Sequence, residues 1–248
     1  MTHNPSGEEI ALLVNSALFR NLSPDQIQSV LFAAQRIPVR RNSFFFHQGE
    51  PATSFYMLLA GHARLTQITP EGRQIIMHFF GPGEAMAVLA LVADEVYPLS
   101  AEATTDCVIL GWDRSTTIQL MEQFPRLAIN GLQMVAERFW ELQARYRELA
   151  TERVERRVAH AILRLVEQGN DRNAGQVPKV LSLSRQDVAE MSGTTHFSVS
   201  RICSNWEQQG ILATGREQIA VLDVNALASI ADDFAQPAPN ATFPTIVR

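Results

Sequence analysis

The chain has 248 residues, of which 46% are apolar and 19% are charged, and its formal net charge at pH 7 is −5. This length allows two domains with cores of their own, and the composition is ordinary for a globular protein. The negative charge excludes a uniformly basic nucleic-acid binder, so any contact with nucleic acid must be local.

The sequence contains no apolar run of the roughly 20 residues that a membrane helix needs, and its start lacks the pattern of a signal peptide. We therefore expect a cytoplasmic protein that makes no contact with a membrane. Cys107 and Cys203 are the only cysteines. Two distant thiols exclude an intrachain four-cysteine zinc site or iron–sulfur cluster.

Two helices are predicted at the beginning of the chain. An apolar stripe of helical period runs through Glu8–Arg20. Ser23, Pro24 and Asp25 then form a typical helix start, with Ser23 as N-cap and Pro24 at the first helical position. We expect this second helix to continue to about Arg36.

Short β-rich runs follow between Ile37 and Trp112, separated by glycines about ten residues apart. This spacing predicts an antiparallel barrel or jelly roll, with a hairpin turn at Thr69–Gly72. The apolar block Met86–Ala93 is consistent with one short helix under the barrel. The predicted strands are Ser43–His47, Phe55–Leu59, Ala63–Ile68, Gln74–Phe80, Ser100–Thr105 and Cys107–Trp112.

A long amphipathic helix is predicted over Ala128–Leu149. Its apolar residues follow one another at steps of four and three, the a/d pattern of a coiled coil. A core helix of a single domain is the alternative, but the flanking regions favour a two-stranded coiled coil that makes the protein a dimer. We call the predicted interface the seam; it comprises Leu132, Val135, Phe139, Leu142, Tyr146 and Leu149.

The stretch Ser184–Gln209 has the pattern of a helix-turn-helix. Ser184 and Asp187 form a capping box, Gly193 suits the turn, and Thr195 can cap the second helix. A generic helical hairpin is the alternative. The β-hairpin predicted at Ala213–Leu222 favours the helix-turn-helix instead, because this β-hairpin would form the wing that follows it. Thr151 is expected to cap a preceding helix over Glu152–Gln168, and a last helix is expected at Asn225–Asp233.

This order of elements resembles the Crp/Fnr superfamily of bacterial transcription regulators. The resemblance covers about residues 10–233, and some motifs look more like the branch of nitric-oxide and denitrification regulators. The resemblance implies an α+β fold with a cyclic-nucleotide-binding-like β-roll at 1–124, a dimerisation helix at 125–150, a winged helix-turn-helix at 151–234 and a disordered tail at 235–248. Its motifs are Ser184–Ala189, Ser198–Arg201, Gln48–Tyr56, Thr69–Gly72 and Tyr97–Ala103.

The family resemblance assigns DNA contacts to individual residues. Arg201 matches an arginine that binds guanine, and Ser200 and His196 match positions that face bases. Arg185, Thr195 and Ser198 match residues near phosphates. Phe197 departs from the family, which usually has a glutamate there, so we predict a half-site that differs from the usual TGA-centred one.

The resemblance also bears on the effector. Cyclic-nucleotide-binding members use a glutamate for the ribose and an arginine for the phosphate, but Val88 and Leu99 occupy those positions here. A buried phosphate without a counter-charge is unfavourable, so we predict no binding of cyclic AMP by the usual mode. Glu84, Arg73 or Glu102 are the possible substitutes, and Ser100 lies at the same pocket.

Other effectors and other classes remain open at this stage. The denitrification branch allows a haem that senses nitric oxide, with His62 or His78 as candidate ligands, and a regulator without effector is also possible. A cupin-like metal enzyme lacks the second histidine of its His-x-His pair after His47, and an interaction module without DNA contact disagrees with Ser184–Leu222. We therefore expect a homodimeric transcription regulator, not an enzyme, with double-stranded DNA and RNA polymerase as partners.

Overall fold

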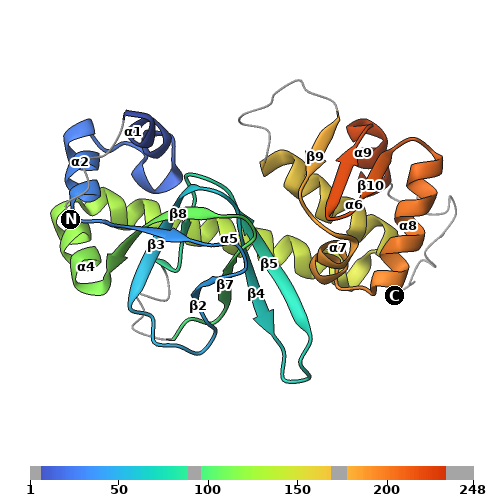
Figure 1. The fold of residues 1–248 in the computed structure, drawn as a ribbon, viewed down its shortest axis with the longest axis horizontal. Coiled ribbons are helices and arrows are strands. Elements are labelled where there is room, and N and C mark those ends of the chain that lie inside the picture. Colours follow the sequence, from blue (N-terminus) through green and yellow to red (C-terminus); the bar gives the residue numbers. More distant parts are fainter. Residues whose placement is uncertain (1–6, 89–95, 169–177, 233–248) are drawn as a thin grey trace, which may run out of the picture. The chain divides into compact units, whose positions relative to one another are not determined.

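The computed structural model describes residues 7–88, 96–168 and 178–232. The chain divides into two compact units, Met1–Ala150 and Thr151–Arg248, which are taken separately below (Figure 1). Within the described residues, no helix is both long enough and apolar enough to cross a bilayer. The predicted tail from residue 235 and most of Met86–Ala93 lie outside these residues.

The first unit begins with α1 (Gly7–Val14), a short 3-10 helix at Ala17–Phe19 and α2 (Pro24–Phe32). The prediction of one continuous helix over Glu8–Arg20 was wrong, because the chain becomes extended at Ser16. The N-cap at Ser23 is confirmed: its Oγ accepts from the Gln26 N–H at 3.3 Å, and Gln26 Oε1 accepts from the Ser23 N–H at 2.9 Å.

The β-roll consists of two antiparallel sheets, in the orders β1-β8-β3-β6 and β2-β7-β4-β5. The jelly-roll prediction is confirmed, but strands β1 and β6 were not predicted. The prediction that α2 continues to about Arg36 was wrong, because β1 already begins at Gln35. Apolar side chains between the sheets, such as Leu58, Ala101 and Ile109, are fully buried. The strands are β1 (Gln35–Val39), β2 (Phe44–Phe46), β3 (Ser54–Ala60), β4 (Ala63–Ile68), β5 (Gln74–Phe80), β6 (Ala85–Met86), β7 (Ser100–Ala103) and β8 (Cys107–Asp113).

Two helices complete the first unit, α4 (Arg114–Gln123) and the long α5 (Pro125–Thr151) (Figure 1). Asn130 fixes the beginning of α5, because its buried Nδ2 donates to the carbonyls of Leu18 and Arg20, both at 2.8 Å. Gly131 follows and lies close to Val88, whose Cγ1 would be in ordinary van der Waals contact, at 3.6 Å, with a Cβ at residue 131.

The second unit is a helical domain with a three-stranded sheet in the order β10-β11-β9. The predicted wing hairpin is confirmed, and β9 adds a strand that was not expected. Thr151 is the last residue of α5 and not an N-cap. The elements are α6 (Val154–Gln168), β9 (Lys179–Leu181), α7 (Arg185–Ser192), α8 (His196–Gln208), β10 (Leu212–Gly215), β11 (Gln218–Val221) and α9 (Val224–Asp232).

Two glycines with the same backbone conformation have different surroundings in the β-roll. Gly49 has φ +87° and Gly61 has φ +88°, values at which an L-residue is strained. A Cβ at Gly49 would meet nothing within 4 Å. A Cβ at Gly61 would lie 2.4 Å from the Asp106 carbonyl oxygen and 2.7 Å from Cys107 Sγ. Gly61 is therefore required for both its backbone conformation and its size.

We predict that Gly61→Ala lowers the free energy of unfolding by about 1–3 kcal/mol more than Gly49→Ala does, because only the former adds an overlap to the backbone strain. Urea unfolding followed by tryptophan fluorescence measures both variants. Equal losses in the two variants would contradict this steric account.

Candidate nucleic-acid interface and sensor site

The turn between α7 and α8 is built by local capping, as predicted. Ser184 Oγ accepts from the Asp187 N–H at 3.1 Å, and Asp187 Oδ2 accepts from the Ser184 N–H at 2.7 Å. Gly193 ends α7 in the left-handed conformation, with φ 62°. Thr195 Oγ1 then accepts from the Ser198 N–H at 3.2 Å and starts α8.

Buried side chains hold the two helices together. Ala189, Val199 and Trp206 are at most 1% exposed and belong to one core cluster with α6 and the wing strands. Arg157 of α6 also fixes the turn, because its Nε and Nη2 donate to the carbonyls of Ser192 and Gly193 at 3.0 and 3.3 Å. Arg157 was not predicted, because nothing in its spacing distinguishes it from the other arginines of α6.

The outer face of α8 carries the predicted base-reading residues. His196, Phe197 and Arg201 are exposed, Phe197 to 86%, whereas Ser200 and Ser198 are half-buried. The Thr195 hydroxyl, which caps α8, lies 3.0 Å from the Ser198 hydroxyl. The first turn of α8 therefore presents the imidazole of His196 and the phenyl ring of Phe197, and the next turn presents the guanidinium of Arg201.

Arg185, predicted to lie near a phosphate, is tied to the wing. Its Nη2 contacts the hydroxyl of Thr214 and lies 3.5 Å from Glu207 Oε2. The hydroxyl and the N–H of Thr214 donate to Glu207 and hold the pKa of this carboxyl below its ordinary value. This cluster joins α7, α8 and β10, which fixes the wing relative to α8.

In the first unit, a charged network joins β5 to α5. The Arg138 guanidinium lies along the His78 ring, with Nη1 3.1 Å from Nδ1 and Nη2 2.8 Å from Nε2. Glu84 Oε1 is 3.2 Å from both His78 Nε2 and Arg138 Nη2. Arg138 also pairs with Glu141 at 2.9 Å. Two turns further along α5, Arg145 donates to the carbonyl of Met77.

Burial and charge set the protonation of this network. Burial lowers the pKa of His78, and the Arg138 guanidinium lowers it further against the opposing effect of Glu84. Burial opposes ionisation of Glu84, but the contacts with His78, the Gly81 N–H and Arg138 outweigh it and hold the pKa of this carboxyl below its usual value. A neutral imidazole thus lies between a carboxylate and a guanidinium.

The four residues predicted at the effector pocket have different neighbours. Glu84 belongs to the charged network. Val88 packs on the apolar core beneath the N-terminal helices. Ser100 is buried on β7, where its Oγ accepts from the Gln48 N–H at 2.8 Å, and Leu99 precedes it half-buried. Of the two further candidates, Glu102 pairs with Arg64 at 2.8 Å and Arg73 lies exposed beside the hairpin turn.

The two candidate haem ligands also differ. His78 is 5% exposed, and both of its ring nitrogens contact the network described above. His62 is exposed in the turn between β3 and β4. Among the described residues, no group of three or more His, Cys, Asp and Glu side chains is placed to hold a metal ion.

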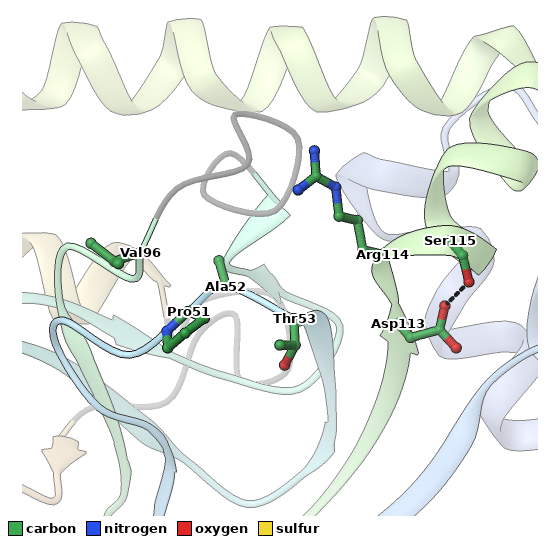
Figure 2. Close-up of a pocket in the computed structure, with 7 residues that line it drawn as sticks. All are labelled: Pro51, Ala52, Thr53, Val96, Asp113, Arg114 and Ser115. Atoms are coloured by element: carbon green, nitrogen blue, oxygen red, sulfur yellow. Dashed lines mark hydrogen bonds between the residues drawn. The ribbon is translucent and has the colours of Figure 1, made fainter.

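An open pocket of about 520 Å³ lies where β8 meets α4 (Figure 2). None of the predicted site residues lines it. Asp113 accepts from the Ser115 hydroxyl at 2.7 Å and from the Thr116 N–H at 2.8 Å, so its carboxylate serves as the N-cap of α4. The lining residues are Pro51, Ala52, Thr53, Val96, Asp113, Arg114 and Ser115.

The seam of α5 is largely exposed to solvent. Five of its six residues, all except Val135, are between 50% and 75% exposed: Leu132, Phe139, Leu142, Tyr146 and Leu149. Ile129 and Trp140, which the sequence analysis did not include, extend this apolar face and are 45% and 63% exposed. Arg138 and Arg145, each one residue before a seam aromatic, lie instead against β5. The seven-residue spacing of these two arginines places them on one side of α5, and it was the signal in the sequence for the side that contacts the β-roll.

Comparison with known proteins identifies both units. The family described as "Cyclic nucleotide-binding domain" matches residues 36–124, and "Crp-like helix-turn-helix domain" matches residues 156–230. The chain is 26% identical to the Cyclic AMP receptor protein of Thermus thermophilus, over 87% of this chain and 97% of that protein.

Two further comparisons agree. The nitrogen fixation regulation protein FixK of Azorhizobium caulinodans is 31% identical over 70% of this chain and 69% of its own length. The solved structure of FixK2 from Bradyrhizobium japonicum matches with a TM-score of 0.70 and 25% identity, covering 82% of this chain and 99% of that one. The chain therefore belongs to the Crp/Fnr superfamily of DNA-binding transcription regulators.

Proposed function

We propose that the protein regulates transcription as a homodimer that binds a palindromic operator, with its two copies joined along the seam of α5. The observation that carries this proposal is the seam itself. A row of leucines and aromatic residues more than half exposed on one helix is unfavourable in water, and pairing with a second α5 buries it. Regulators of this family bind DNA and act as dimers.

The recognition surface supports the DNA-binding half of the proposal. The exposed first turn of α8 matches the part of a helix-turn-helix that enters the major groove, and the wing is held beside it by Arg185 and Glu207. Two such helices in a dimer read half-sites one helical turn apart, about 34 Å. RNA polymerase is the proposed protein partner.

We further propose that the effector is not cyclic AMP bound in the usual mode. The name of the Thermus thermophilus relative describes that protein, whereas this chain has Val88 in an apolar core and Leu99 before Ser100. Two charged groups of the network between β5 and α5, Glu84 and Arg138, already bind each other and His78. A nucleotide phosphate would find no free counter-charge among Val88, Leu99 and Ser100.

For the dimer, we predict that Phe139→Arg converts the protein to a monomer, because it places two like charges in the centre of the seam. Analytical ultracentrifugation at micromolar concentration measures the mass. The matched control is Gln133→Arg, which introduces the same charge change at an exposed position off the seam and leaves the dimer intact. A monomeric wild-type protein, even with palindromic DNA present, refutes the proposal.

For DNA reading, we predict that Arg201→Ala lowers affinity for the operator by about 1–3 kcal/mol and removes discrimination at one base pair per half-site. The control is Arg216→Ala, which removes the same charge from the exposed wing turn and should weaken all sequences alike. Binding-site selection from random DNA with both variants makes the test. Unchanged selectivity in Arg201→Ala contradicts this role.

For the effector, we predict that isothermal titration of the wild-type protein with cyclic AMP gives no binding heat. Arg138→Ala, which opens the network, should remain equally silent, because the missing counter-charge at Val88 and Leu99 is the cause. Binding by Arg138→Ala alone would instead assign the exclusion to the network. Tight binding by the wild type would overturn the proposal.

A further inference from the structure

Phe197 has no folding role that explains its position. It is the second residue of α8 and, at 86%, the most exposed large apolar side chain among the described residues. It lies outside the core cluster that holds Val199 and Ile202. Its one ring neighbour is His196, at 6.2 Å between centroids and with an interplanar angle of 79°. One exposed apolar residue alone is ordinary, but this ring lies in the first turn of the helix that we propose to read DNA, where it is free to contact a base.

The helix geometry places this ring beside the guanidinium of Arg201. Residues four apart share one face of a helix, and the rise between them is about 6 Å. This distance is slightly less than two base-pair steps of about 3.4 Å. If Arg201 binds a guanine, Phe197 therefore meets a base about one or two pairs away.

The chemistry of the major groove then narrows what Phe197 can recognise. The base edges there present hydrogen-bond donors, acceptors and a single apolar group, the C5-methyl of thymine. A phenyl ring neither donates nor accepts, and the nearby hydroxyls of Thr195 and Ser198 contact each other. Only a methyl group offers Phe197 a favourable partner.

We propose that Phe197 is a specificity-determining residue that reads the C5-methyl group of a pyrimidine, thymine in the first place, near the guanine bound by Arg201. This inference rests on the proposed DNA-binding function and deepens it. The same methyl group occurs on 5-methylcytosine, so the experiment below distinguishes the two sources. A protein partner for the ring is the competing explanation.

The test uses the full-length protein and the operator that it selects from random DNA. Each thymine is replaced in turn by uracil, which removes only the methyl group, and affinity is measured by fluorescence anisotropy. We expect one position per half-site to lose about fourfold in affinity, the effect of one buried methyl group, and the other positions to stay unchanged. Phe197→Ala should bind the thymine and uracil operators equally.

Two further arms complete the design. Cytosine and 5-methylcytosine at the sensitive position test the second source: a gain of about fourfold on methylation shows that the ring reads the methyl group on either base, and no gain confines the reading to thymine. His196→Ala is the matched control, because it removes the neighbouring ring and should retain the uracil effect. Thermal unfolding verifies that each variant is folded.

The outcomes distinguish a failure of this inference from a failure of the proposed function. Failure to select any operator refutes the proposed function. An operator without a uracil-sensitive thymine, or one whose sensitivity persists in Phe197→Ala, overturns the methyl reading alone. Unchanged DNA affinity in Phe197→Ala together with reduced transcription by RNA polymerase in vitro also overturns it, and assigns the ring to a protein partner.

Discussion

The first unit depends on the contact between one side of α5 and its own β-roll. Arg138 binds His78 and Glu84, Arg145 binds the Met77 carbonyl on the edge strand β5, and Asn130 anchors the start of the helix to the N-terminal segment. These contacts fix the rotation of α5 about its axis. The seam faces away from the β-roll as a result, so the same helix that completes the first unit presents an exposed apolar face.

Much of this architecture could be predicted from the sequence, because it depends on local signals. Ser23, Ser184 and Thr195 were predicted as caps, and each side chain accepts the expected N–H. Apolar periodicity found α5 and most strands, since alternation and heptad spacing record which side is buried. The residues of α8 that are predicted to face bases came from the family resemblance, and the structure shows that His196, Phe197 and Arg201 are exposed.

The features that were not predicted lack such local signals. β1 is short, carries Arg36 and Pro38 and has no fully buried residue, so its apolar content does not mark it as a strand. The charged network unites residues 54 to 60 positions apart, and no local rule pairs a histidine on a strand with an arginine on a distant helix. Arg157 and Arg185 likewise bond to partners that only the fold brings close. The predicted helix starts are therefore confirmed, whereas the predicted effector pocket stays a prediction.

The side of α5 that contacts the β-roll also bears on which chains can pair. Coiled coils commonly choose partners through charged residues that flank the apolar positions. Arg138 and Arg145 hold such flanking positions, yet they are bound within their own chain. In the proposed dimer, discrimination against a similar chain would therefore rest on the shapes of apolar seam residues such as Phe139 and Tyr146, and not on these two charges.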